Sequence, residues 1–120
     1  MCVPNPYFIY VAGPISKGDV FANIRLGIDT GAELRKLGFA PFVPHYDYPA
    51  YMWRNDVWDY ETVLANDFDW IMKCDAILRL PGESAGADRE VAFANEQKIP
   101  VYFSVSDLLD ARDEANDRYN

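Results

Sequence analysis

Cysteine, basic residues and long apolar runs are all scarce in this chain. Cys2 and Cys74 are the only cysteines, and with no Cys-x-x-Cys or Cys/His spacing they predict reduced thiols and neither disulfides nor a metal site. Eleven Lys and Arg against nineteen Asp and Glu give a net charge of −8, which leaves no basic stripe for a nucleic acid polymer. No apolar run approaches the roughly 20 residues of a membrane span, and the start lacks the pattern of a signal peptide. We therefore expect a cytoplasmic protein without nucleic-acid or membrane partners.

The 120 residues, half of them hydrophobic, predict one α/β domain over 1–120 with an acidic tail at 106–120. Strands are expected at residues 7–12, 39–43, 76–80 and 101–104, and helices at 19–37, 60–73, 88–97 and 107–120. Segment 45–59 has no clean period. Because strands alternate with helices, we expect a flavodoxin-like or Rossmann-like parallel sheet of four to five strands flanked by helices, with the second strand beside the first, then the third and fourth.

The helix expected at 19–37 has apolar residues at roughly helical spacing. This spacing predicts that one stripe faces the core while the charged residues between 25 and 36 face outward. The predicted inward stripe consists of Phe21, Ile24, Ile28, Ala32 and Leu37.

Two Gly-containing loops follow the first and third expected strands. In the predicted strand order these loops meet beyond the carboxyl ends of the strands, where ligands of such sheets bind. The first loop, GPISKG, offers Gly13, Ser16 and Lys17 to a phosphate or a sugar hydroxyl. The second, PGESAGADRE, contains Gly86 and ends at Glu90. Each has a simpler interpretation, an ordinary turn with a solvated Lys or a first-turn acid favoured by the helix dipole. Their convergence favours a ligand site.

Asp67 is the second candidate acid. It shares a helix face with Leu64 and Ile71, and an acid on an apolar face is either paired or functional. With Glu90 it would form a carboxylate pair of the kind that glycosidic-bond chemistry uses, although a buried cap or salt-bridge role stays open. His45, the only histidine, is expected to be structural or to orient a ligand. The aromatic cluster between 46 and 58 either stacks on a nucleobase or packs as a lid or subunit contact.

Three motifs together resemble the nucleoside 2-deoxyribosyltransferase superfamily, especially its 2′-deoxynucleoside 5′-monophosphate N-hydrolase branch. They are YVAGPISKG at 10–18, NDFDWIMKCDAILRL at 66–80 and SAGADREVAFA at 84–94. The resemblance implies that Glu90 attacks C1′ of the sugar, that Asp67 orients or protonates the departing base, and that Tyr10 orients the nucleophile. It also implies that Ser84, with Ser16 and Lys17 nearby, contacts a 5′-phosphate, where transferases carry an acid in place of this Ser.

The chain also departs from this family pattern. An Arg expected near the phosphate is missing, and Val91 replaces a common Gly. Asp88 and Arg89 stand where apolar residues are usual, so Arg89 either binds phosphate or pairs with Asp88. In the family a neighbouring subunit's C-terminal part completes the pocket, which implies a homodimer or higher homo-oligomer and would involve residues 119 and 120 here.

These observations predict an enzyme that cleaves the N-glycosidic bond of a (deoxy)nucleoside or its 5′-monophosphate, by hydrolysis or transfer, without cofactor or metal. The alternative is a catalytically idle module that binds a nucleotide-derived ligand in the same crevice.

Overall fold

The computed structural model describes residues 5–118, so that Cys2, Tyr119 and Asn120 lie outside the described residues. The strands are β1 (Phe8–Ala12), β2 (Ala40–Phe42), β3 (Ala76–Arg79) and β4 (Val101–Tyr102). The helices are α1 (Val20–Lys36), α2 (Tyr48–Trp53), α3 (Tyr60–Ile71), α4 (Ala85–Glu96) and α5 (Val105–Arg118), with a 3₁₀ turn, η1, over Pro44–Asp47. The strands form one open parallel sheet in the order β2-β1-β3-β4, so the predicted α/β fold and strand order are confirmed.

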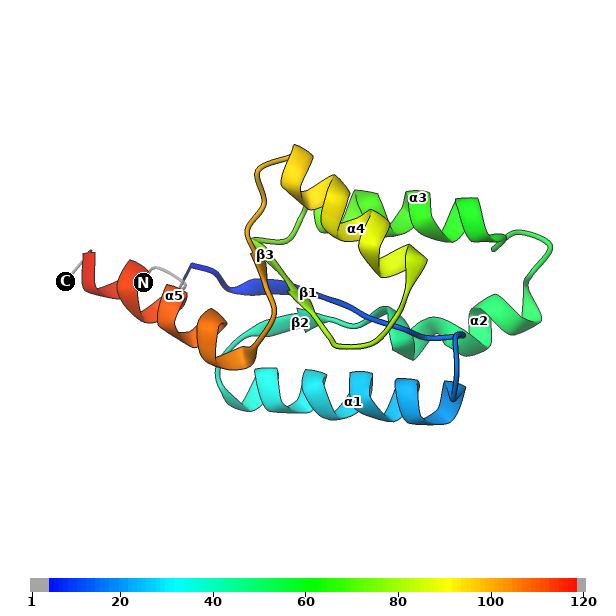
Figure 1. The fold of residues 1–120 in the computed structure, drawn as a ribbon, viewed down its shortest axis with the longest axis horizontal. Helices are drawn as coiled ribbons and strands as arrows, with labels where there is room; N and C mark the ends of the chain where they lie inside the picture. Colours follow the sequence, from blue (N-terminus) through cyan, green and yellow to red (C-terminus); the bar gives the residue numbers. More distant parts are fainter. Residues whose placement is uncertain (1–4, 119–120) are drawn as a thin grey trace.

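The sheet is covered on both faces, with α1 on one side and α3 and α4 on the other (Figure 1). Successive residues of β1 point to opposite faces, so Ile9 and Val11 join the core cluster that contains Leu34 of α1. Tyr10 joins the opposite cluster together with Ile71 of α3. The central strand is therefore buried on both sides, which explains its continuous apolar sequence.

Helix α1 buries a different face from the one that its apolar spacing predicts. Phe21 is 86% exposed and Ile28 is also exposed, whereas Gly27 and Gly31 are buried. A Cβ atom on Gly27 would lie 2.5 Å from Cγ of His45 in η1, so only a glycine allows this close approach of the helix. The predicted inward stripe is therefore wrong for Phe21, Ile28 and Ala32, whereas Ile24 is half-buried and Leu37 packs against the core. Backbone proximity at the two glycines, rather than side-chain apolarity, decides how α1 packs.

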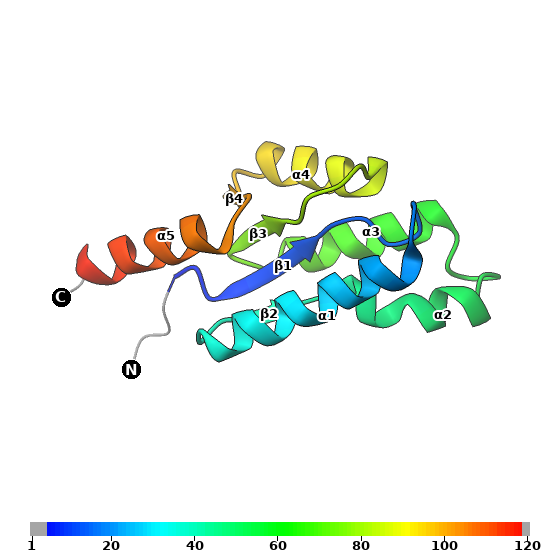
Figure 2. The same cartoon turned by 60° about the horizontal axis from the view of Figure 1, so that its bottom comes forward.

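Several predicted element boundaries also shift. Helix α4 begins at Ala85 rather than at 88 because Oγ of Ser84 accepts a hydrogen bond from the Ala87 N–H, at 3.1 Å, and caps the helix. Ser104 similarly caps α5, so β4 ends two residues earlier than predicted. Part of the segment without a clean period is helical, as η1 and α2. Helix α5 extends away from the sheet (Figure 2).

Candidate active site

A cavity of about 400 Å³ lies where the loops after β1 and β3 meet, at the carboxyl ends of these adjacent strands. Every residue predicted from the sequence to bind substrate lines this cavity: Gly13, Ser16, Lys17, Ser84 and Gly86. Asp67 and Glu90 line it as well. The fold thus brings together side chains from three separate parts of the chain, as the strand order requires.

Two buried acids line the cavity, and a buried phenol that does not itself line it contacts one of them. Glu90 of α4 and Asp67 of α3 are each only 6% exposed. The hydroxyl of Tyr10, a fully buried residue of β1, donates a hydrogen bond to Oε2 of Glu90. Within the part of the chain that the structure describes, Oδ1 of Asp67 is buried without a hydrogen-bond partner. A buried acceptor without a partner is costly, so this oxygen is suited to receive a donor from a ligand.

Burial raises the pKa values of all three side chains. It raises the pKa of Glu90 well above its ordinary value, and repulsion by Asp67 raises it further, while the Tyr10 hydrogen bond and the Arg79 charge oppose the rise. Burial also raises the pKa of Asp67, to about 6. The pKa of Tyr10 is raised by burial and by both acids, so Tyr10 stays a donor. Burial and mutual repulsion therefore favour a form in which the two carboxyls share one proton.

Arg79, at the end of β3, organises the second loop. Its side chain is only 10% exposed. The guanidinium donates to the carbonyl oxygens of Leu80 and Gly82, the latter at 3.0 Å, and to Oδ1 of Asp88 at 3.1 Å. This cation joins the loop to α4 and lies close enough to lower the pKa of Glu90. The sequence reasoning missed it, although a charged residue that ends an apolar strand before a Gly-containing loop is a usable signal.

The pairing of Asp88 and Arg89 considered from the sequence does not occur. Asp88 instead pairs with Arg79, and Arg89 pairs with Glu61 of α3 at 3.0 Å. The Arg89 guanidinium also lies 5.7 Å from the ring centre of Tyr60. Arg89 is not among the residues that line the cavity, so it supports the pocket wall from outside.

Contacts on both sides fix the first loop, residues 13–18. Behind it, Nε2 of buried His45 donates to the carbonyl oxygen of Pro14 at 3.2 Å, and the Asn23 side chain donates to the carbonyls of Ile15 and Lys17. His45 therefore has the structural role that was one of its two predicted roles. In front, the Lys17 ammonium lies 2.8 Å from Oε1 of Glu83 and joins the two loops across the mouth of the cavity.

Aromatic side chains form one wall of the cavity, and the structure divides the aromatic cluster noted in the sequence. Tyr48, Tyr51 and Trp58 line the cavity together with Tyr60. The ring centres of Tyr51 and Trp58 lie 5.8 Å apart. Flat, amphipathic rings of this kind suit a planar ligand with an apolar face. Tyr46 and Trp53 do not line the cavity; the Tyr46 hydroxyl packs against Gly31 and Trp53 is exposed.

Residues 5–118 contain neither a helix that could span a membrane nor a cluster of metal-binding side chains. No helix there combines enough length with enough apolarity to cross a bilayer. No three His, Cys, Asp or Glu side chains in the same range gather closely enough to hold a metal ion.

Comparison with other proteins identifies the domain. No curated protein matches the chain. The profile of a family described as "Domain of unknown function (DUF7768)" matches residues 7–104, a range that includes both loops, Tyr10, Asp67 and Glu90. Because the match extends over most of the sequence, the chain belongs to the DUF7768 family.

Proposed function

We propose that this protein cleaves the N-glycosidic bond of a (deoxy)nucleoside or its 5′-monophosphate, with Glu90 as the nucleophile. The observation that carries the proposal is the pair of buried carboxyls, Glu90 and Asp67, in a cavity with an aromatic wall. Paired carboxyls with raised pKa values serve such bonds, because one attacks or stabilises the anomeric carbon while the other handles the proton. The resemblance of the three motifs to deoxyribosyltransferase-like enzymes supports the same chemistry.

The proposed reaction has two displacements. In the first, an oxygen of ionised Glu90 forms a bond to C1′ while the C1′–N bond breaks, and its electron pair leaves with the base. The reactive form is the one in which the proton that the two carboxyls share lies on Asp67, whose pKa is raised to about 6, and Asp67 gives that proton to the base. In the second, water attacks C1′, the ester bond to Glu90 breaks, and the water proton passes to Asp67. A second base in place of the water would give transfer rather than hydrolysis.

The other predicted residues have supporting roles in this proposal. The Tyr10 hydroxyl donates to Oε2 of Glu90 and would fix the orientation of this carboxyl for attack. Tyr51 and Trp58 offer flat faces to the base. Ser16, Lys17, Ser84 and Gly86, which line the cavity at the first loop and at the start of α4, would surround the 5′ end of the sugar.

A binding module without catalysis is the second candidate. The specific observation in its favour is the raised pKa of Glu90, because a neutral carboxyl is a poor nucleophile. In that case the orphan oxygen of Asp67 and the aromatic wall would still hold a nucleoside-like ligand.

The test is product analysis after incubation with nucleosides and their 5′-monophosphates, with and without an acceptor base. Glu90→Gln should lower kcat by on the order of 10³ or more. Glu96→Gln is the matched control, because Glu96 is an exposed acid of the same helix. Mass spectrometry of the protein quenched during turnover should find a glycosyl group on Glu90. An active Glu90→Gln variant would refute the mechanism. A wild-type protein that binds these ligands without cleaving them would be the binding module.

A further inference from the structure

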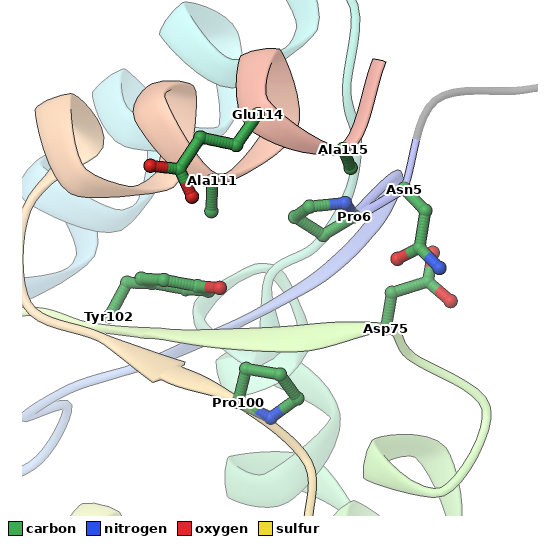
Figure 3. Close-up of a pocket in the computed structure, with 8 residues that line it drawn as sticks. All are labelled: Asn5, Pro6, Asp75, Pro100, Tyr102, Ala111, Glu114 and Ala115. Atoms are coloured by element: carbon green, nitrogen blue, oxygen red, sulfur yellow. The ribbon is translucent and has the colours of Figure 1, made fainter. Parts of the chain in front are cut away.

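A second cavity, of about 320 Å³, lies at the opposite edge of the sheet from the acid pair (Figure 3). Pro6, Asp75 and Pro100 line it, and each stands just before β1, β3 or β4. Because these strands are parallel, the residues before them gather at one edge, where no part of the proposed glycosidic chemistry takes place. This cavity is therefore separate from the candidate active site.

Helix α5 closes the cavity from the other side. Ala111, Glu114 and Ala115 are spaced by three and four residues, so they share one face of α5. The two small alanine side chains leave space in front of the sheet, and Glu114 is the one charged side chain that α5 contributes to the lining. Figure 3 shows Glu114 and Tyr102 on one side of the cavity and Asp75 with Asn5 on the other.

Asp75 is held in place by the backbone. Its Oδ2 accepts hydrogen bonds from the N–H groups of Tyr7 and Phe8, both at 2.9 Å. Both bonds use the same oxygen, which leaves Oδ1 for another donor. Asp75 and Glu114 thus place two carboxylates on opposite sides of one cavity, and none of the residues that line it is a Lys or Arg.

We propose that this cavity binds an organic cation, a guanidinium or ammonium group on an apolar stem. The two carboxylates complement a positive charge that carries several N–H donors. The ring of Tyr102 and the rings of Pro6 and Pro100 supply the apolar surface, and an aromatic face attracts a cation. A bare metal ion fits less well, because no three acidic, His or Cys groups come together in residues 5–118. The net charge of −8 favours the approach of any cation.

The cation would connect α5 to the sheet. The helix is anchored in its first turn by buried Leu108 and at its middle by Arg112, which donates to the carbonyl oxygen of Leu37 and lies 4.4 Å from the ring centre of Phe39. Glu114 lies beyond these anchors, towards the carboxyl end of α5, and the helix itself extends away from the sheet (Figure 1). A ligand held between Glu114 and Asp75 would therefore fix the outer half of this helix.

The test is NMR titration of the full chain with butylguanidinium, at about 150 mM salt to limit unspecific attraction. N-butylurea is the matched neutral ligand, since it has nearly the same shape without the charge. Butylguanidinium should shift the amide signals of Tyr102, Ala111 and Ala115, and butylurea should bind about tenfold more weakly or not at all. A blocked tripeptide with a central Arg separates the two sources of such a group, because a partner protein's side chain would bind better as a peptide than as the free cation.

Substitutions decide between a built site and general attraction to an acidic protein. Glu114→Gln should weaken butylguanidinium binding by about five- to tenfold. Asp110→Asn removes the same charge from the same helix, but Asp110 does not line the cavity. The affinity of this variant for butylguanidinium should therefore match that of the wild type. Equal losses for the two variants, equal affinity for butylurea, or no localised shifts at millimolar ligand would overturn the proposal.

Discussion

The Lys17 ammonium and the Glu83 carboxylate lie 2.8 Å apart and join the two loops at the mouth of the candidate active site. Both side chains are well exposed, so the pair adds little to the stability of the fold. Its effect falls on the ligand, because a 5′-phosphate would compete with Glu83 for the same cation. Glu83 thus adds negative charge at the place where the resemblance implies a phosphate.

Glu83→Gln should therefore change which substrate is preferred. Removing this anion frees Lys17, so kcat/KM for a 5′-monophosphate should rise by about three- to tenfold relative to the matching nucleoside. The ratio should return toward that of the wild type at high salt, because the pair is exposed. Steady-state rates for both substrates measure the ratio, and an unchanged ratio would place the 5′ end away from Lys17.

Ser84→Asp tests the same phosphate contact by adding a negative charge where Glu83→Gln removes one. Asp is as good an N-cap as Ser, so the start of α4 should be kept while a negative charge is added beside the 5′ end. Monophosphate cleavage should fall and nucleoside cleavage should be kept. Ser84→Ala serves as the control, since losing the cap should lower the free energy of unfolding by about 1 kcal/mol without reversing the preference. Equal effects of Ser84→Asp on both substrates would contradict a phosphate contact.

Tyr10→Phe should act through the ionisation of Glu90. The Tyr10 hydrogen bond lowers the pKa of Glu90, so its loss should raise that pKa further and leave less of the ionised nucleophile. We expect kcat/KM at neutral pH to fall about tenfold and the acidic limb of the pH–rate profile to move to higher pH. Tyr7→Phe, outside the cavity, is the control. A uniform loss of rate at every pH would indicate a packing role instead.

Asp67→Asn should stabilise the domain in a pH-dependent way. The folded-state pKa of Asp67 is raised to about 6, so its contribution to stability is present below the unfolded value near 3.8 and is lost as pH rises through 6. As the pH rises from 4 to 7.5, the free energy of unfolding of the variant should therefore increase by on the order of 1–3 kcal/mol relative to that of the wild type. Urea unfolding at the two pH values measures this gain, and a difference that does not depend on pH would mean that Asp67 is not buried in ionised form.

Gly27→Ala should destabilise α1 although Ala is the better helix former. The added methyl group would lie 2.5 Å from Cγ of His45, and such overpacking costs about 1–3 kcal/mol. Ile28→Ala, on the exposed face, should change the free energy of unfolding by less than about 0.5 kcal/mol. Chemical denaturation compares them. The reverse order of effects would restore the apolar stripe predicted from the sequence as the buried face.

The sequence was most informative where parallel-sheet geometry determines the outcome. Loops after adjacent parallel strands must meet at one edge, so the neighbourhood of Lys17, Ser84 and Glu90 followed from the strand order. Asp67 was found because an acid interrupts an apolar helix face. The predicted catalytic roles stay predictions.

Two features could not be obtained in this way. The packing of α1 depends on the absence of side chains at Gly27 and Gly31, which hydrophobic periodicity does not represent. Tyr51 could not be distinguished from Trp53 because α2 is only six residues long and its segment has no clean period, so tertiary contacts alone decide which aromatic lines the cavity.

The hydrogen bond between Tyr10 and Glu90 joins residues that are 80 positions apart in the chain. Its two partners belong to the first strand and the fourth helix, so no contiguous fragment shorter than this span contains the acid with its donor. We expect a contact of such long sequence separation to form late in folding, because much of the chain must be ordered before the contact is favourable. Any ligand that binds the acid pair therefore binds only the assembled domain and, by mass action, raises the stability of the whole fold. At saturating ligand, the occupied fraction of this one cavity thus equals the folded fraction of the domain.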